Sequence, residues 1–206
     1  MIITVTSHKG GVGKTVTAVH LAAYLSWHTG MSNEASTLLV DADPNHNALR
    51  WQQRGALPFS VVAEEQAAEH APKHQHIVID TQGRPGKEDL EALVQGCDLL
   101  VIPSMPDALS LDTLMLTIGE LEELGRKDGY RVLLTSVPPW PIRSGSKARR
   151  TLDDLGVPLF DAEIRRREAF QKAAIMGVPV YDAKDRRATD GWNDYCRVAE
   201  EITTQT

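Results

Sequence analysis

Two lysines in a glycine-rich stretch are the first candidates for chemistry. The segment "SHKGGVGKT" (7–15) contains Lys9, Lys14 and three glycines, and a hydroxyl follows at Thr15. Glycines allow positive φ angles and close backbone approach, so successive N–H groups of such a loop can surround a phosphate. A lysine at the end of the loop reaches the outer phosphates of a nucleotide, and the hydroxyl after it ligates Mg²⁺. The stretch therefore predicts a loop that binds a nucleoside triphosphate with magnesium.

The spacing departs in one place from the common phosphate-binding pattern, Gly-x-x-x-x-Gly-Lys-Ser/Thr. That pattern requires a glycine at position 8, where the chain has His8. The strand, loop and helix predicted around the stretch still match the motif. The residues expected to contact the nucleotide are Lys9, Gly10, Gly11, Val12, Gly13, Lys14, Thr15 and Val16.

Carboxylates follow two further apolar runs. "TLLVDADP" (37–44) carries Asp41 and Asp43, and "HIVIDTQG" (76–83) carries Asp80. A carboxylate at the end of a buried strand can hold Mg²⁺ directly or through its water, which is the role expected of Asp80. We expect Asp41 to face the terminal phosphate and to orient or deprotonate the attacking water, with Asp43 supporting the loop. The alternative is purely structural, with Asp43 starting a turn and Asp41 capping a helix.

Elements that could position these residues alternate along the whole chain. Strands are predicted over 2–6, 37–42, 59–63, 76–81, 98–103, 131–137 and 158–164, and several are apolar on both faces. Helices are predicted over 15–27, 87–96, 109–126, 146–156, 166–177 and 189–202. This alternation predicts one α/β domain over residues 1–206, a P-loop NTPase with a mostly parallel twisted sheet and helices on both faces. Ligands of such sheets bind at the carboxyl ends of the strands, where the three motifs lie.

Composition narrows the possible functions. A net charge of −6 argues against a uniformly basic surface, although a local basic patch remains compatible with it. Cys97 and Cys196 form no pair with metal-site or disulfide spacing, which favours a reduced compartment. No apolar run approaches the ~18–20 residues that a membrane-spanning helix needs. We expect a cytoplasmic protein with no membrane partner.

The segments "KGGVGKT", "LLVDADP", "HIVIDTQG" and "CDLLVIPSMPDALSLD" together resemble the deviant Walker ATPases of the ParA/MinD superfamily. That family writes its loop Lys-Gly-Gly-x-x-Lys-Ser/Thr, so it needs no glycine at position 8. The resemblance implies ATP and Mg²⁺ as cofactors and an ATP-dependent homodimer. It makes Lys9 the signature lysine, which reaches the phosphates bound by the other subunit.

The resemblance also assigns roles to single residues. It implies Lys9, Lys14 and Asp41 as catalytic residues, and Thr15, Asp41 and Asp80 as metal ligands. Pro179, in "MGVPV" (176–180), matches the stretch that approaches the adenine in relatives.

Within the superfamily the chain is similar to short ParA-type positioning ATPases. The end "CRVAEEITTQT" lacks the basic face of the membrane-binding branch. The resemblance implies binding to nonspecific double-stranded DNA on the nucleoid, and hydrolysis stimulated by a ParB-like or organelle adaptor protein. The cargo would be a plasmid or chromosome partition complex, or a protein organelle such as the carboxysome. The alternative is a metabolic P-loop enzyme of the same fold, an amidoligase or synthetase that phosphorylates a small molecule.

Basic residues concentrate in the last third of this acidic chain, which favours a DNA-binding face there over ordinary solvated helices. The candidates are Lys147, Arg149, Arg150, Arg165, Arg166, Arg167, Lys172, Arg186 and Arg187.

Overall fold

A six-stranded parallel sheet forms the centre of the computed structural model, which describes residues 1–28, 36–126 and 128–204. The spatial order is β3-β2-β4-β1-β5-β6, and every neighbouring pair is parallel. The strands are β1 (Ile2–Ser7), β2 (Thr37–Ala42), β3 (Ser60–Ala63), β4 (His76–Gly83), β5 (Leu99–Ser104) and β6 (Tyr130–Leu134). The predicted α/β class and parallel sheet are confirmed.

Eight α-helices are found in the described residues. They are α1 (Lys14–His28), α2 (Asn47–Arg54), α3 (Ala67–His70), α4 (Lys87–Gly96), α5 (Ala108–Glu123), α6 (Ser144–Asp154), α7 (Glu168–Met176) and α8 (Ala188–Thr203). Short 3₁₀ turns cover Glu64–Gln66 (η1), Ala71–Lys73 (η2) and Val180–Asp182 (η3). The described helices include none that is long and apolar enough to cross a membrane.

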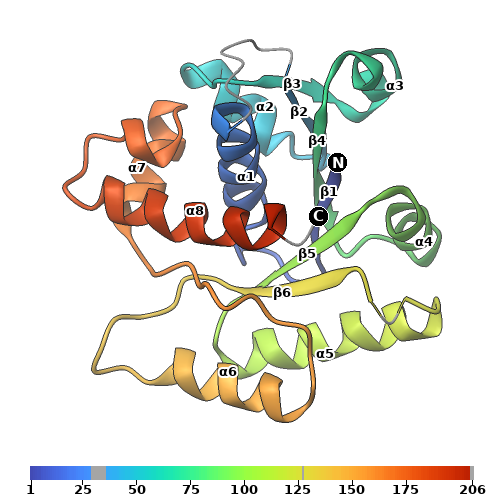
Figure 1. The fold of residues 1–206 in the computed structure, drawn as a ribbon, viewed down its shortest axis with the longest axis vertical. Coiled ribbons are helices and arrows are strands. Elements are labelled where there is room, and N and C mark those ends of the chain that lie inside the picture. Colours follow the sequence, from blue (N-terminus) through green and yellow to red (C-terminus); the bar gives the residue numbers. More distant parts are fainter. Residues whose placement is uncertain (29–35, 127, 205–206) are drawn as a thin grey trace.

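Helices cover both faces of the sheet because its strands are apolar on both sides (Figure 1). On β5, Val101 packs in the cluster that includes α1, α7 and α8, whereas its neighbours Leu100 and Ile102 pack in the cluster with α4, α5 and α6. β6 alternates in the same way at Leu133 and Leu134. This period of two divides the core into two layers.

The seventh predicted strand, over 158–164, is wrong. The segment makes one isolated bridge to β6, between Val132 and Leu159, and the Ile164 amide donates to the Leu134 carbonyl at 2.9 Å. The backbone amides of Asp161 and Ala162 donate instead to the Glu201 carboxylate, at 3.0 and 2.7 Å. Because this side chain takes the Ala162 amide, which the next pair of a parallel ladder would use, the pairing with β6 is interrupted after Phe160.

Candidate functional site

The glycine-rich loop joins β1 to α1 at the carboxyl edge of the sheet. Gly11 and Gly13 adopt φ angles of 76° and 92°, which only glycine adopts without strain. The amide of Thr17 donates to the Gly13 carbonyl at 2.9 Å, so the first turn of α1 follows directly. Thr135, directly after β6, donates its hydroxyl group to the Val12 carbonyl at 2.7 Å, and this hydrogen bond fixes the middle of the loop.

A cleft of about 1010 Å³ opens beside this loop. Its size is at the upper end of the ~300–1,000 Å³ typical of small-molecule sites. The predicted nucleotide contacts that line it are Lys9, Gly10, Gly11, Gly13, Lys14, Thr15 and Val16. Two predicted contacts are not among the residues described as lining it: Val12 is buried beneath the loop, and Pro179 is buried before η3.

Lys14 lies at the floor of the cleft. Its side chain is largely buried, and its ammonium group donates to the Lys9 carbonyl at 3.3 Å. Burial lowers the pKa of Lys14, and the carboxylates of Asp80 and Asp43 oppose this change. A cation that is poorly solvated, and that keeps donors for a ligand, is suited to bind phosphate oxygens.

Asp80 is fully buried, and neither carboxylate oxygen makes a hydrogen bond to the described residues. Burial raises its pKa to about 7, while the nearby Thr15 hydroxyl opposes the rise without a well-aligned hydrogen bond. An unsatisfied buried carboxylate is costly unless a cation completes its surroundings. Asp80 and Thr15 therefore fit Mg²⁺.

The described residues contain no cluster of three or more His, Cys, Asp or Glu side chains around a possible metal position. Mg²⁺ is commonly held by one or two protein oxygens together with substrate phosphates and water. Thr15 and Asp80 supply such a pair, and the remaining ligands would come from the nucleotide.

The structure gives Asp41 and Asp43, the two carboxylates at the end of β2, different roles from those that we expected. Both oxygens of Asp41 are taken by backbone amides, those of Asp43 at 3.2 Å and Leu49 at 2.9 Å, and its side chain is almost fully buried. Asp43 lines the cleft, where its carboxylate also accepts from the backbone and side chain of Asn45. Asp41 thus organises the loop and the start of α2, and the carboxylate available to a ligand is that of Asp43.

Lys9 turns away from Lys14 and contacts the beginning of α5. Its ammonium group lies 3.2 Å from the Asp107 carboxylate and donates to the Ser110 hydroxyl at 2.7 Å. Asp107 also caps α5, since it accepts from the Ser110 amide at 3.0 Å. Burial raises the pKa of Asp107, but the hydrogen bonds from Ser110 and Lys9 outweigh burial and hold the pKa below its ordinary value.

His8, in the position where the common pattern has glycine, also contacts α5. Its Nε2 atom lies 3.2 Å from the Glu120 carboxylate. The loop is therefore joined to α5 by two consecutive side chains, His8 and Lys9, that leave the phosphate-binding glycines free.

Several lining residues were missed by the sequence reasoning. Trp51 and Arg54 of α2 form part of the wall, together with Gly83 and Arg84 at the end of β4. A Cβ atom at Gly83 would lie 3.5 Å from the Lys14 ammonium group, an ordinary contact distance, so the end of β4 runs directly beside Lys14. Its position three residues after Asp80, in "DTQG", was the available signal.

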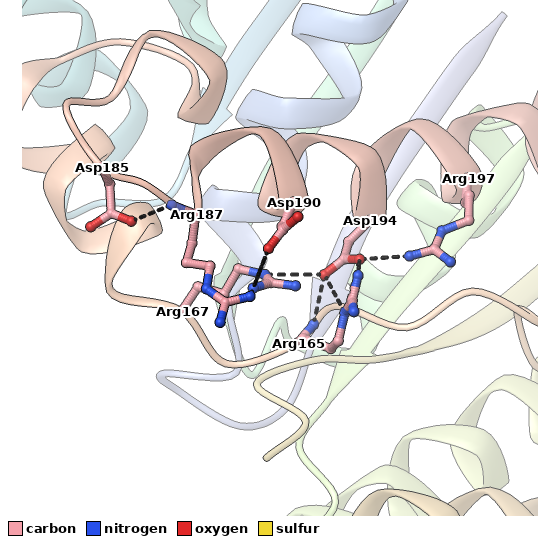
Figure 2. Close-up of polar contacts among 7 residues, drawn as sticks. All are labelled: Arg165, Arg167, Asp185, Arg187, Asp190, Asp194 and Arg197. Atoms are coloured by element: carbon pink, nitrogen blue, oxygen red, sulfur yellow. Dashed lines mark hydrogen bonds and ion pairs between the residues drawn. The ribbon is translucent and has the colours of Figure 1, made fainter. Parts of the chain in front are cut away.

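Acidic partners surround many of the basic residues predicted to contact DNA. Figure 2 shows Asp194 of α8, which is fully buried, with arginines around it. Arg165 donates from its guanidinium group to Asp194, and the guanidinium of Arg167 lies 3.6 Å away. Asp190 accepts from Arg167 at 3.3 Å and from Arg187 at 3.0 Å. These three arginines therefore have structural roles within the chain.

The remaining candidates fall into two groups. Lys172 donates to Asp185 at 2.6 Å, and Arg149 donates to the Phe160 carbonyl at 2.9 Å. Arg150 is exposed and lies 4.0 Å from Asp154, which is a weak pair. Among the candidates, the exposed residues without an ion pair to any described residue are Lys147, Arg166 and Arg186.

Comparisons with known proteins agree with this geometry. The family model described as "CobQ/CobB/MinD/ParA nucleotide binding domain" matches residues 3–180. The chain is 36% identical over 208 residues to "Maintenance of carboxysome distribution protein A" of Gloeobacter kilaueensis, covering 98% of this chain and 93% of that protein. It is 29% identical to "Protein ParA" of Rhizobium radiobacter, over 90% of this chain and 87% of the relative.

A solved structure shares the fold. A plasmid partition protein of Borrelia burgdorferi B31 bound to AMPPNP superposes with a TM-score of 0.73 at 17% identity, over 100% of this chain and 99% of that one. Together with the loop, Asp80 and the parallel sheet, these similarities show that the chain belongs to the ParA/MinD family of P-loop nucleotide-binding domains.

Proposed function

We propose that the protein is a Mg·ATP-dependent ATPase that dimerises with ATP, binds nonspecific DNA in that state and positions an intracellular cargo. One observation carries the proposal. The two lysines of a single phosphate-binding loop point to different places, Lys14 into the cleft and Lys9 to the start of α5. Because Lys9 is held outside its own phosphate cradle, it is available to a second subunit that faces the cleft once it is released from Asp107.

Each side chain of the site has a chemical role in this proposal. Lys14 and the loop amides bind the phosphates, and Thr15 with Asp80 holds Mg²⁺, which neutralises phosphate charge when bound. Asp43 orients the attacking water, while Asp41 keeps the loop in shape. Lys9 of the partner subunit adds positive charge where negative charge accumulates during hydrolysis, as an arginine finger supplied in trans does.

The cargo is proposed from the relatives. The carboxysome distribution protein matches the chain over nearly its whole length at higher identity than the ParA relative. This favours a protein organelle as cargo over a plasmid or chromosome partition complex. An adaptor protein on the cargo would stimulate hydrolysis, and the ATPase would act in the cytoplasm on the nucleoid.

The DNA-binding surface is proposed to centre on the basic residues that the chain leaves unpaired. Lys147 lies on α6, Arg166 precedes α7, and Arg186 precedes α8. A dimer doubles the number of phosphate contacts, so the affinity depends on ATP and falls steeply with salt. Arg165 and Arg167 contribute only indirectly, because their guanidinium groups already pair with the carboxylates of Asp194 and Asp190.

Retention of the protein on an arbitrary DNA duplex tests the proposal. The measurement compares ATP, ADP and no nucleotide over a salt series, with wild type and with Lys147→Ala combined with Arg166→Ala. We expect retention only with ATP, and a salt slope that is shallower by about 0.9 for each phosphate that the variant no longer neutralises. Equal retention in all three nucleotide states would rule out an ATP-gated DNA-binding function.

The same assays distinguish the proposed function from the metabolic alternative. A kinase-like enzyme or synthetase transfers the terminal phosphate to a small molecule, so its turnover depends on that molecule and not on DNA or an adaptor. Phosphate release that is unaffected by DNA and adaptor, together with ATP-independent DNA retention, would favour the alternative.

A further inference from the structure

A second hollow lies on the face of the sheet opposite to α1. It has a volume of about 270 Å³, and its floor contains Ile79 of β4 and Leu93 of α4, both half-buried. The volume is well below that of typical cofactor sites, whereas an apolar cavity of ~150 Å³ holds one benzene. The hollow therefore has room for one or two aliphatic side chains.

The wall formed by α4 is a continuous helix face. Asp89, Ala92, Leu93 and Gly96 recur at three- and four-residue spacing and all line the hollow. On this half of the sheet the packing is thin, because only a small cluster around Leu38, Val40 and Val62 lies over it, packed by short helical segments. The hollow is thus the part of this face that α3 and α4 leave uncovered.

The rim of the hollow is acidic. Glu64 and Asp89 line it directly, and both are exposed. Exposed neighbours in sequence add negative charge at Glu65, Glu88 and Glu91. An apolar floor between carboxylates is complementary to a segment that carries aliphatic side chains between arginines or lysines.

The hollow and the nucleotide cleft share one segment of the chain. Thr81, Gln82 and Pro85 line the hollow, whereas Gly83 and Arg84 of the same segment line the cleft. Side chains alternate along β4, so Ile79 faces the hollow while Asp80 faces Thr15 and Lys14. Any occupant of the hollow therefore contacts the segment that carries Asp80.

The strand beside β4 extends this link to the other carboxylate loop. Ala42 lines the hollow and pairs in register with Thr81, directly after the pairing of Asp41 with Asp80. Arg84 adopts a φ of 60°, a left-handed conformation that a residue with a side chain adopts only at a cost. A strained segment with one face on each site is suited to change conformation when the hollow is filled.

We propose that this hollow is the docking site for a basic, amphipathic segment of the adaptor protein, through which the adaptor acts on the loops after β2 and β4. The adaptor protein is part of the proposed function, so this inference rests on that proposal. The segment places one or two aliphatic side chains on Ile79 and Leu93 and pairs its basic residues with Glu64 and Asp89.

A binding measurement without nucleotide or DNA tests the site. The probe is a fluorescein-labelled helical peptide with leucine on one face and arginine on the other, compared with a scrambled isomer of the same composition. Glu64→Lys reverses the charge at the rim, Ala92→Trp fills the hollow from an exposed helix position, and Asp153→Lys on α6 is the matched control. We expect each hollow variant to weaken peptide binding by about tenfold and the control to leave it unchanged.

Several outcomes would overturn the proposal. These are equal binding of both peptides, equal binding by wild type and the two hollow variants, or an equal loss in Asp153→Lys. A change of oligomeric state in the hollow variants with unaltered peptide binding would assign the surface to a second copy of the chain instead. If the protein shows no ATP-dependent DNA retention but the hollow variants still bind the peptide more weakly, the proposed function is wrong and the docking site stands. If DNA retention depends on ATP but the hollow variants bind the peptide as wild type does, the docking site alone is overturned.

Discussion

The ammonium group of Lys9 lies 3.2 Å from the carboxylate of Asp107, a residue 98 positions further along the chain. In a single chain this pair holds the signature lysine at the start of α5. A lysine that serves the other subunit must leave this position when the dimer forms.

Asp107→Asn is expected to make dimerisation easier. Asparagine caps a helix as well as aspartate does, but it lacks the charge that holds Lys9. Exposed ion pairs contribute about 0.2–1 kcal/mol each, so two subunits together predict a dimer dissociation constant lowered by roughly 2- to 30-fold. Sedimentation with a non-hydrolysable ATP analogue measures this. Asp112→Asn, which also lines the cleft, is the control, and an equal change in both variants would contradict the role of the pair.

Asp80→Asn is expected to separate stability from metal binding. Without nucleotide, the variant should unfold at the same or a higher temperature than wild type at pH 8, because a buried carboxylate without a hydrogen-bond partner is removed. The additional stabilisation that Mg²⁺ gives to the ATP-bound wild type should be absent. Thermal unfolding with ATP, with and without Mg²⁺, measures both effects, and an undiminished Mg²⁺ effect would exclude Asp80 as a ligand.

Substitutions of Asp41 and Asp43 are expected to impair the protein in different ways. Asp41→Ala leaves two buried backbone amides without their acceptor and should lower the free energy of unfolding by about 1–3 kcal/mol. Asp43→Asn should keep the fold and ATP binding but lose hydrolysis. Denaturant unfolding and phosphate release distinguish the two, and a stable, inactive Asp41→Ala with an active Asp43→Asn would restore the original assignment.

His20 is expected to make the protein sensitive to acid. It is fully buried, its Nδ1 donates to the Val16 carbonyl and its Nε2 accepts from the Val180 amide, and burial lowers its pKa to about 4. Between pH ~6.5 and ~4 the unfolded chain binds a proton that the folded chain does not, so the free energy of unfolding falls by up to about 3 kcal/mol. Above pH ~6.5 both states are neutral and the effect vanishes.

Unfolding curves over this pH range measure the effect, with His20→Gln as the comparison. The variant should lose stability overall, because the imidazole stacks on Tyr195 at 4.8 Å between ring centroids. Its dependence on pH in this window should be weaker by the His20 contribution. An unchanged pH dependence would show that the imidazole is protonated in the folded protein.

The fold was predictable because its signals are local. No helix range was predicted for α2 or α3. Each predicted helix, and each predicted strand but one, nevertheless lies close to its predicted position, and the phosphate loop depends on glycines that are visible in the sequence. The exception, 158–164, depends on Glu201, about 40 residues away, whose carboxylate takes the amides of Asp161 and Ala162.

The site was less predictable because its assignments depend on distant partners. Asp41 and Asp43 are equivalent in a strand-end pattern, and the start of α2 decides which of them is buried. The pairing of Lys9 with Asp107, and of Arg165 with Asp194, joins residues that no local pattern connects. The number of basic residues along the chain therefore identified a basic segment of the sequence. It could not identify which of those side chains remain unpaired in the fold.

The composite nature of the site is tested most directly by mixing two inactive variants. Lys9→Ala keeps its own Asp43, and Asp43→Asn keeps its own Lys9, so a mixed dimer contains one complete site if the lysine acts across the interface. Equal amounts are combined before ATP is added, and phosphate release is compared with each variant alone. The account predicts recovery to about one quarter of the wild-type rate, since half of the dimers are mixed and each has one working site. A mixture no more active than the two variants alone would contradict it.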